Sequence, residues 1–205
     1  MAQEPAEVQV RPGVEGDLTA LTDLYNHYVR ETAITFDTVP FLPEERRPWL
    51  LSHPKDGPHR LLVAQSGEGG ETDEPGEAGE LGKSSRGSAR REAGGGTAPR
   101  ILGYATSSPL RPKPAYATSV EVSVYCAPEA AGRGVGTLLY RRLLAALEGE
   151  DVHRAYAGIA LPNPASVRLH ERFGFRHLGT YREVGRKFGR YWDVAWYELP
   201  LGPRD

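Results

Sequence analysis

The chain has 205 residues, a formal net charge of −2 and one cysteine, a length that favours a single domain with a sizeable core. The small net charge excludes bulk attraction to nucleic acid or an anionic membrane, and Cys126 alone excludes an internal disulfide framework. Because no apolar run is long enough to span a membrane and the first residues lack a signal peptide's basic and apolar regions, we expect a cytoplasmic protein with no membrane partner.

The first part of the chain predicts a short strand at residues 8–12 and then a helix. Asp17 is expected to cap this helix, and its buried face is expected to be apolar: Leu21, Leu24, Tyr25, Tyr28 and Val29. Asn26 and His27 lie on the same helix, either as an exposed polar flank or as support behind a site. Residues 32–38 are β-branched and irregular, and we expect this segment, with Phe36, to lie over a pocket.

A second helix is predicted at residues 43–52, with Trp49 and Leu50 buried, and a strand at residues 60–65. Residues 66–100 differ in composition, because they are rich in glycine and charge and have no aromatic residue. Such a segment buries too little apolar surface to offset its ordering entropy. We therefore expect a disordered insertion at 66–100; a regulatory or partner-binding role is the alternative.

The sheet is expected to resume at residues 101–107, as the hairpin partner of 60–65. The following loop, residues 109–116, is stiffened by prolines and carries Arg111, Lys113 and Tyr116. It leads into a strand in which Val120, Val122 and Val124 alternate with polar or aromatic residues, a period of two.

A glycine-rich turn separates this strand from a helix that begins near Val135. Glycines at 132, 134 and 136 allow the backbone to approach a ligand closely, and the first N–H groups of the helix then face it. This turn contains no Gly-Lys-Ser/Thr, and its glycine spacing differs from the dinucleotide fingerprint. The pattern predicts an anion cradle; a purely structural turn is the alternative.

The last informative stretch follows a predicted buried strand at residues 154–160. Asn163 is expected to cap a helix with Pro164 at its first position, and Gly174 is expected to end it. Asn163, Ser166 and His170 fall on one face of this helix. Such a polar stripe predicts a border with something polar, although His170 could instead be a satisfied core histidine.

Together these motifs resemble the GNAT acetyltransferases, which hold acetyl-CoA. Arg133 to Gly136 fit the pyrophosphate loop Gln/Arg-x-x-Gly-x-Gly/Ala, although Ala131 stands at its first position. The stretch from Asn163 to Phe175 resembles N-x-x-S/A-x-x-Leu-Tyr/His-x-x-x-Gly-Phe in its histidine form. That form, with residues 26–28 and 184–193, resembles the phosphinothricin and methionine sulfoximine acetyltransferase branch.

The resemblance implies an α+β fold in which a mostly antiparallel sheet splays between the Glu121 strand and the 154–160 strand, with helices on both faces. It implies one domain over residues 1–205 and acetyl-CoA as co-substrate. The expected acetyl-CoA contacts are Val124, Tyr125, Cys126, Gly132, Arg133, Gly134, Val135, Gly136, Thr137, Asn163 and Ser166. Arg111, Lys113 and Tyr116 match the loop that binds the acceptor's anionic end, and Phe36 is expected to wall the same pocket.

Acetyl transfer to an amine requires a base, a stabilised oxyanion and a leaving thiolate. Glu121 is expected to be the base, with a pKa raised by burial; an exposed or ion-paired glutamate is the alternative. His170 is expected to act as the acid near the sulfur or as a second base. Cys126 has no neighbour that would lower its thiol pKa, which disfavours a covalent acetyl-enzyme. The histidines show no metal-ligand spacing, so no metal is expected.

The sequence therefore predicts an acetyl-CoA-dependent N-acetyltransferase that acts on a small amino acid or analogue by direct attack in a ternary complex. The alternatives are a protein lysine or N-terminal acetyltransferase and a non-catalytic CoA-binding module. We also expect a homodimer, since Tyr191, Trp192, Trp196 and Tyr197 suggest an apolar surface.

Overall fold

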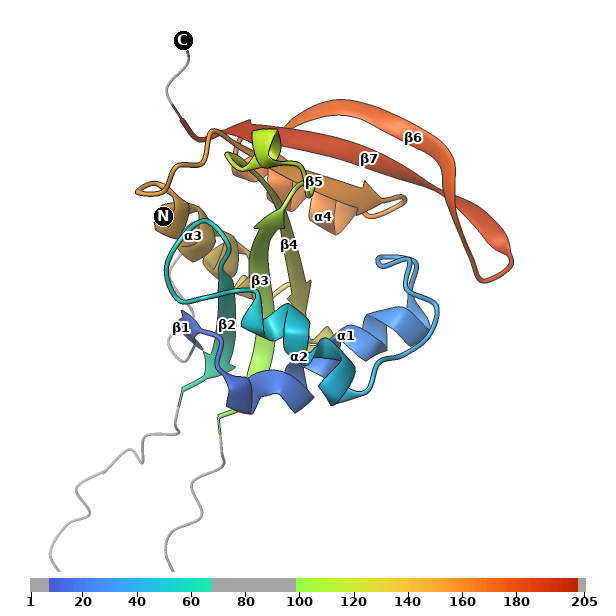
Figure 1. Cartoon of the computed structure of the whole chain (residues 1–205). Coiled ribbons are helices and arrows are strands. Elements are labelled where there is room, and N and C mark those ends of the chain that lie inside the picture. The colour runs from blue at the N-terminus through green and yellow to red at the C-terminus, as the bar shows by residue number, and fades with distance from the viewer. Residues whose placement is uncertain (1–7, 68–98, 203–205) are drawn as a thin grey trace, which may run out of the picture.

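We describe residues 8–67 and 99–202 of a computed structural model of the chain. This part contains one seven-stranded sheet in the order β1-β2-β3-β4-β5-β7-β6 (Figure 1). The strands are β1 (Val8–Pro12), β2 (Leu61–Ser66), β3 (Ile101–Pro109), β4 (Ser119–Cys126), β5 (Arg154–Ala160), β6 (Arg176–Lys187) and β7 (Arg190–Pro200). All neighbouring pairs are antiparallel except β4 and β5, which confirms the expected mixed, mostly antiparallel sheet.

The sheet splays where β4 and β5 meet. The two strands pair only from Ser119 to Glu121 on β4 and from Arg154 to Tyr156 on β5. On its other side, β4 stays paired with β3 as far as Cys126. The edge of β4 that faces β5 is therefore unpaired beyond Glu121, and its backbone groups are available to a ligand. This splay was expected at these two strands and is confirmed.

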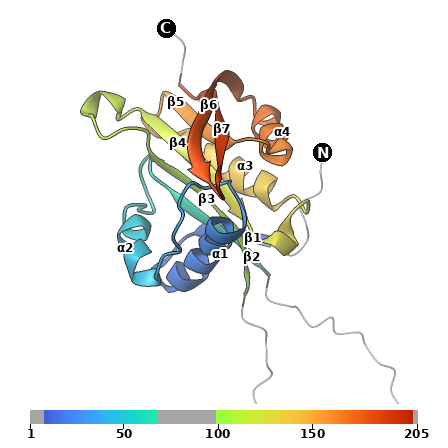
Figure 2. The same ribbon diagram turned by 90° about the vertical axis from the view of Figure 1, so that its right-hand side faces the viewer.

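Helices cover both faces of the sheet, as Figure 2 shows. Helices α1 (Leu18–Glu31) and α2 (Pro43–Leu51) lie on one face, and α3 (Val135–Leu147) and α4 (Pro164–Arg172) lie on the other. Short 3-10 turns occur at Glu15–Asp17, Pro114–Tyr116 and Pro128–Ala130. None of the helices in the described part is long and apolar enough to cross a membrane.

The alternation along β4 separates the core from the site. Val120 and Val122 are buried, together with Leu139 and Leu143 of α3. The intervening residues project to the opposite face, so that Glu121 and its neighbours there are only partly buried. The strand is thus anchored by its apolar side and presents polar groups on the other, as the period of two predicts.

Two details of the N-terminal helices correct the sequence expectations. The Asp17 carboxylate does not cap α1. It accepts two hydrogen bonds from the Arg11 guanidinium, at 2.7 and 2.8 Å, and one from the Val14 N–H at 2.9 Å. A charged partner from β1 outcompetes the helix terminus for this carboxylate. Trp49 is only half-buried, whereas Leu50 is buried as expected.

Strands β2 and β3 form the expected hairpin on either side of the glycine-rich segment. The Ser66 N–H donates to the Arg100 carbonyl at 2.9 Å, and the Arg100 N–H donates to Ser66 Oγ at the same distance. The ends of this segment therefore lie side by side. The predicted insertion itself lies outside the described residues apart from these ends.

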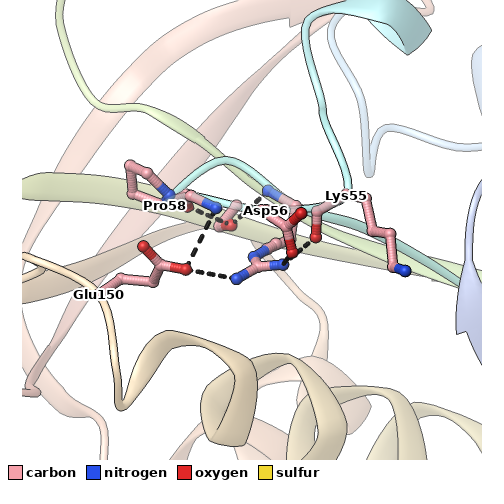
Figure 3. Close-up of polar contacts among 7 residues, drawn as sticks. Lys55, Asp56, Pro58 and Glu150 are labelled. Carbon is pink, nitrogen blue, oxygen red and sulfur yellow. Dashed lines mark hydrogen bonds and ion pairs between the residues drawn. The ribbon is translucent and has the colours of Figure 1, made fainter.

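A charged cluster fastens the loop between α2 and β2 to the end of α3. The Arg60 guanidinium contacts the Glu150 carboxylate and the Lys55 carbonyl, and Asp56 lies 3.6 Å from it (Figure 3). Arg60 is mostly buried, with 15% of its side chain exposed. An ion pair in such partial burial links this loop to the turn that follows α3.

The sequence did not predict the long β6–β7 hairpin, which completes the sheet beyond β5. Near its end, buried Lys187 donates from Nζ to the Thr35 carbonyl at 2.7 Å. Gly185 packs so closely against Phe36 that an added Cβ would lie 2.1 Å from the ring. The β6–β7 hairpin therefore packs against the segment at residues 32–38 and holds it in place.

The aromatic residues proposed for a dimer surface are not all exposed. Tyr191 is 59% exposed, but Trp192 and Trp196 are half-buried and Tyr197 is buried. The expectation that all four form an apolar surface is wrong, because Trp196 and Tyr197 pack into the β5–β7–β6 part of the sheet. The exposed apolar side chains of the hairpin are instead Leu178, Tyr181, Val184, Phe188 and Tyr191.

Candidate active site

The opening between β4 and β5 brings together four of the eleven predicted acetyl-CoA contacts and His170. Val124 and Tyr125 come from β4, and Asn163, Ser166 and His170 come from α4 or its N-terminus. These residues line one cleft, called the β4–β5 cleft below, together with Ile34, Tyr140 and the β5 residues Gly158 to Ala160. The polar stripe on α4 therefore borders the splay, as its spacing predicted.

Asn163 also shapes the cleft by starting α4 where the sequence predicts. Its side-chain oxygen accepts from the Ser166 N–H at 3.1 Å, and Pro164 follows at the first helical position. At the other end Gly174 adopts a left-handed φ of 85°, the conformation that terminates a helix. Both ends of α4 are thus fixed by local sequence.

The glycine-rich turn forms a concave backbone surface at the start of α3. Gly132 and Gly134 have φ values of 74° and 83°, a region that glycine adopts without steric cost. No heavy atom lies within 4 Å of the position a Cβ would take at either residue. Left-handed glycines beside the free N–H groups of a first helical turn form an anion-binding concavity. This geometry fits a pyrophosphate.

The other residues of the turn contribute differently. The Val135 side chain is 2% exposed and belongs to the core, so only its backbone can face a ligand. Arg133 is exposed, and its N–H donates to the Ala130 carbonyl at 3.3 Å. Thr137 Oγ1 accepts from the Arg172 guanidinium at 3.3 Å. Gly136 faces Cys126 and Leu169, with each 3.5 Å from a built Cβ, so it permits α3 to pack closely.

Glu121 lies in a cavity of about 260 Å³ that adjoins the β4–β5 cleft. We call it the Glu121 cavity; its walls include Phe36, Tyr181, Val184 and Trp196. Ile34, Gly158 and Ala160 line both the cavity and the cleft. Burial raises the pKa of Glu121 above its ordinary value, and the positive charge of Arg111 lowers it in part. The carboxylate is thus a stronger base than an exposed glutamate.

Arg111 and Tyr116 lie in the next cavity, of about 440 Å³. We call it the Arg111 cavity; it shares Tyr181 and Trp196 with the Glu121 cavity. Phe36 is not among its walls, so Phe36 and Arg111 face neighbouring cavities rather than one pocket, which corrects that expectation. Lys113 is exposed and lines neither cavity.

His170 is buried, and both of its ring nitrogens have partners. Nδ1 lies 2.8 Å from the Ser166 carbonyl, to which it must donate. Nε2 lies 2.8 Å from the Tyr140 hydroxyl, so it accepts from that group. Burial lowers the pKa of His170, which keeps the ring neutral near pH 7. In this state His170 has no free proton to donate.

Tyr140 is a site residue that the sequence reasoning missed. Its periodicity on α3 is that of a core residue, and its side chain is fully buried. Only the packing of α3 against α4 places its hydroxyl on His170. The sequence gives no signal for a polar role of Tyr140, since a phenylalanine at this position would fit the apolar periodicity of the helix equally well.

The thiol of Cys126 is unsuited to covalent catalysis. Burial raises its pKa to about 11, so it stays protonated at neutral pH. The Cys126 carbonyl accepts from the Tyr28 hydroxyl at 2.6 Å, which fixes the end of β4 to α1. Among residues 8–67 and 99–202, no group of three or more histidine, cysteine or carboxylate side chains is arranged to hold a metal ion.

Comparison with known proteins places this geometry in a family. The model of the acetyltransferase (GNAT) family matches residues 83–175. A phosphinothricin N-acetyltransferase from Streptomyces coelicolor is 67% identical over 96% of this chain and 98% of its own. An L-methionine sulfoximine/L-methionine sulfone acetyltransferase from Pseudomonas paraeruginosa is 28% identical over 95% of each chain.

Solved structures show the same fold. The crystal structure of a GNAT superfamily phosphinothricin acetyltransferase from Sinorhizobium meliloti, in complex with acetyl-CoA, superposes with a TM-score of 0.75. It is 27% identical and covers 95% of this chain and 89% of its own. An N-acetyltransferase from Staphylococcus aureus superposes with a TM-score of 0.74 at 28% identity, covering 95% of this chain and 99% of its own.

Proposed function

The chain belongs to the GNAT acetyltransferase family and is an N-acetyltransferase, and we propose that its acceptor is the amino group of a small free amino acid or analogue. Phosphinothricin, methionine sulfoximine and methionine sulfone are the substrates in the names of its relatives. Acetyl-CoA is the donor, as in the structure from Sinorhizobium meliloti. Transfer proceeds by direct attack in a ternary complex.

One observation carries this proposal. A carboxylate with a raised pKa, Glu121, stands in a cavity that shares three wall residues with the β4–β5 cleft. The cavity, of about 260 Å³, has the scale of a small amine and its apolar walls exclude water from part of it. A donor in the cleft and an amine in the cavity would meet beside the base.

The residues then have separable roles. Glu121 accepts the proton of the attacking amine, directly or through a water. Free N–H groups on the β4 edge between Val124 and Cys126 stabilise the oxyanion, and the glycine turn with Asn163 and Ser166 holds the donor. The hydrogen-bonded pair of Tyr140 and His170 lines the same cleft and helps to position the donor, and the leaving thiolate takes its proton from water. Arg111 binds the oxygens at the end of the acceptor's side chain, a phosphinate, sulfone or sulfoximine, with Tyr116 beside it, while exposed Lys113 contributes charge only.

Two alternatives are less well supported. A protein lysine or N-terminal acetyltransferase must admit an extended peptide, whereas the cavity beside Glu121 has the volume of a small amine and its other walls come from four separate segments of the chain. A non-catalytic CoA-binding module would not require a base of raised pKa. The names of the two curated relatives reported above likewise refer to small amino acid analogues.

Assembly, location and domain limits complete the proposal. We propose a homodimer, supported by the exposed apolar side chains of the β6–β7 hairpin, among them Tyr181 and Phe188. Its test is a solution mass measured over a range of concentrations. A cytoplasmic location is proposed because the acetyl donor is a metabolite of the cell interior. We also propose one domain that carries residues 66–100 as an insertion.

The experiment that tests the function is release of free thiol from acetyl-CoA against a panel of acceptors. The panel contains phosphinothricin, methionine sulfoximine, methionine sulfone, ordinary amino acids and short peptides with and without lysine. Turnover of the free amino acids supports the proposal. Turnover of peptides alone contradicts it and supports protein acetylation, and binding of CoA without turnover of any amine contradicts catalysis altogether.

A further inference from the structure

A third cavity, of about 280 Å³, lies on the α1–α2 side of β4 and has no role in the function described so far. We call it the Arg46 cavity; its walls include Tyr25, Arg46, Trp49, Tyr104 and Thr106. Ser123 and Tyr125 line both this cavity and the β4–β5 cleft. They follow Glu121 on the same face of β4. The cavity therefore begins next to the place where the amine is acetylated.

The cavity contains a buried cation without a carboxylate partner. Arg46 is 6% exposed, and its guanidinium stacks between the rings of Tyr25 and Trp49, at 4.3 and 3.9 Å from their centroids. It donates one hydrogen bond, from Nη1 to the Leu21 carbonyl at 3.1 Å. No ion pair within the described residues involves Arg46. An arginine held this firmly, with donors to spare, suits a bound oxyanion.

A second group in the same cavity points to the same ligand. Tyr104 is 1% exposed, and its hydroxyl has no hydrogen-bond partner in the described part of the chain. The positive charge of Arg46 acts on this hydroxyl, and both side chains line the cavity. A buried hydroxyl left without a partner is costly in a native protein. A carboxylate placed between Tyr104 and Arg46 would satisfy both.

Two carboxylates of the protein also line this cavity, but they lie at its rim and leave room for a ligand carboxylate beside Arg46. Asp37 and Glu45 are exposed, whereas Arg46 and Tyr104 are buried. Asp37 accepts from the Tyr25 hydroxyl, and Glu45 accepts from the Leu42 N–H at 2.7 Å. Negative charge at the rim disfavours a ligand that carries only negative charge. A zwitterionic amino acid has no net charge, so the rim repels it less.

We propose that the Arg46 cavity binds the α-carboxylate of the acceptor amino acid, an inference that depends on the proposed function. In an amino acid the carboxylate and the attacking nitrogen are on the same carbon. A nitrogen beside Glu121 therefore places the carboxylate near Ser123 and Tyr125, at the mouth of this cavity. The side chain then extends the other way, towards the Arg111 cavity. Two cations on opposite sides of the base thus select an α-amino acid over a simple amine.

The test compares methionine sulfone with its α-carboxamide as acceptors, by initial rates at saturating acetyl-CoA. In the wild type, we expect the carboxamide to have a kcat/KM lower by roughly 10- to 100-fold, the scale of a lost charge-assisted hydrogen bond. In Arg46→Lys and Arg46→Met, the preference for methionine sulfone over its α-carboxamide should shrink, because methionine sulfone loses affinity and the carboxamide does not. The KM for acetyl-CoA stays unchanged.

Tyr104→Phe separates binding from packing. If the hydroxyl has no ligand, its removal from a buried site stabilises the protein or leaves it unchanged and does not affect kinetics. We expect the melting temperature to hold or rise while the KM for methionine sulfone increases several-fold. This readout does not depend on whether the arginine variants fold.

The outcomes distinguish a wrong assignment of the Arg46 cavity from a wrong proposed function. Unchanged acid-over-amide preference in the Arg46 variants, or an unchanged KM in Tyr104→Phe, overturns the assignment of this cavity. Loss of the preference in Arg111→Gln, with Arg46→Lys unaffected, places the carboxylate in the other cavity and also overturns it. A wild-type enzyme that acetylates no free amino acid overturns the proposed function itself, and this inference with it.

Discussion

The contact between Gly185 and Phe36 gives a prediction with a calculable size. Gly185→Ala would place a methyl group 2.1 Å from Cε2 of Phe36, and ordinary contact begins at 3.4 Å. The ring must therefore shift by more than an ångström. The available space is the Glu121 cavity, of about 260 Å³, which the ring already lines. The displaced ring occupies the space proposed for the acceptor.

Overpacking of this kind typically costs about 1–3 kcal/mol. A cost of about 1.4 kcal/mol in acceptor binding corresponds to a tenfold change in KM. We expect the KM for methionine sulfone to rise by about that factor, with the KM for acetyl-CoA unchanged, in a thiol-release assay. The double variant Gly185→Ala with Phe36→Leu should recover most of the loss, because the smaller side chain removes the clash.

Gly16→Ala is the matched control, since no atom lies within 4 Å of the added Cβ and the backbone there does not need glycine. It should leave both KM values unchanged. If Gly185→Ala also leaves the acceptor KM unchanged while the protein remains folded, Phe36 does not bound the acceptor site. The placement of the acceptor in the Glu121 cavity would then be wrong.

Three further predictions follow from single features. Gly134 has a φ of 83° with open space around it, so Gly134→Ala should cost about 1 kcal/mol in stability. Gly134→Asp should bind CoA more weakly than Gly134→Ala in calorimetry, because it adds a negative charge. Equal CoA affinity for the two variants would exclude a nearby phosphate. Arg111 lowers the pKa of Glu121, so Arg111→Gln should raise that pKa and move the acidic limb of the kcat/KM profile to higher pH; a limb that stays in place would show that Arg111 does not act on the base. Ser66 and Arg100 are joined by two hydrogen bonds at 2.9 Å, so replacing residues 68–98 with a short turn should preserve kcat; a large loss would show that the insertion takes part in the reaction.

Most elements near the site could be predicted because their causes are local. The glycine turn before Val135 and the cap at Asn163 depend on neighbouring residues, and both occur where the sequence places them. Asp17 was misassigned because its partner, Arg11, comes from a strand rather than from the helix. The structure of a local motif can therefore be predicted from sequence, except where a charged residue from a distant segment binds one of its side chains.

The parts that could not be predicted depend on contacts between distant segments. Strand β6 lacks a clear alternation, contains Glu183 with a φ of 51°, and shifts register twice against β7. It has the pattern of a loop, although it supplies Tyr181 and Val184 to the Glu121 cavity. Tyr140 and Arg46 have ordinary helical positions, and only tertiary packing shows that one contacts His170 and the other lines a cavity.

The central claim is that Glu121 is the base, and the pH dependence of Glu121→Gln tests it most directly. A base works only when deprotonated, so the rate falls as pH drops through the Glu121 pKa, which burial raises. We expect Glu121→Gln to lose about 10²- to 10⁴-fold in kcat, to keep its affinity for acetyl-CoA and to lose the acidic limb. His170→Ala should retain that limb, since His170 has both nitrogens engaged. The opposite pattern, with the limb lost in His170→Ala and kept in Glu121→Gln, would contradict the account and make histidine the base.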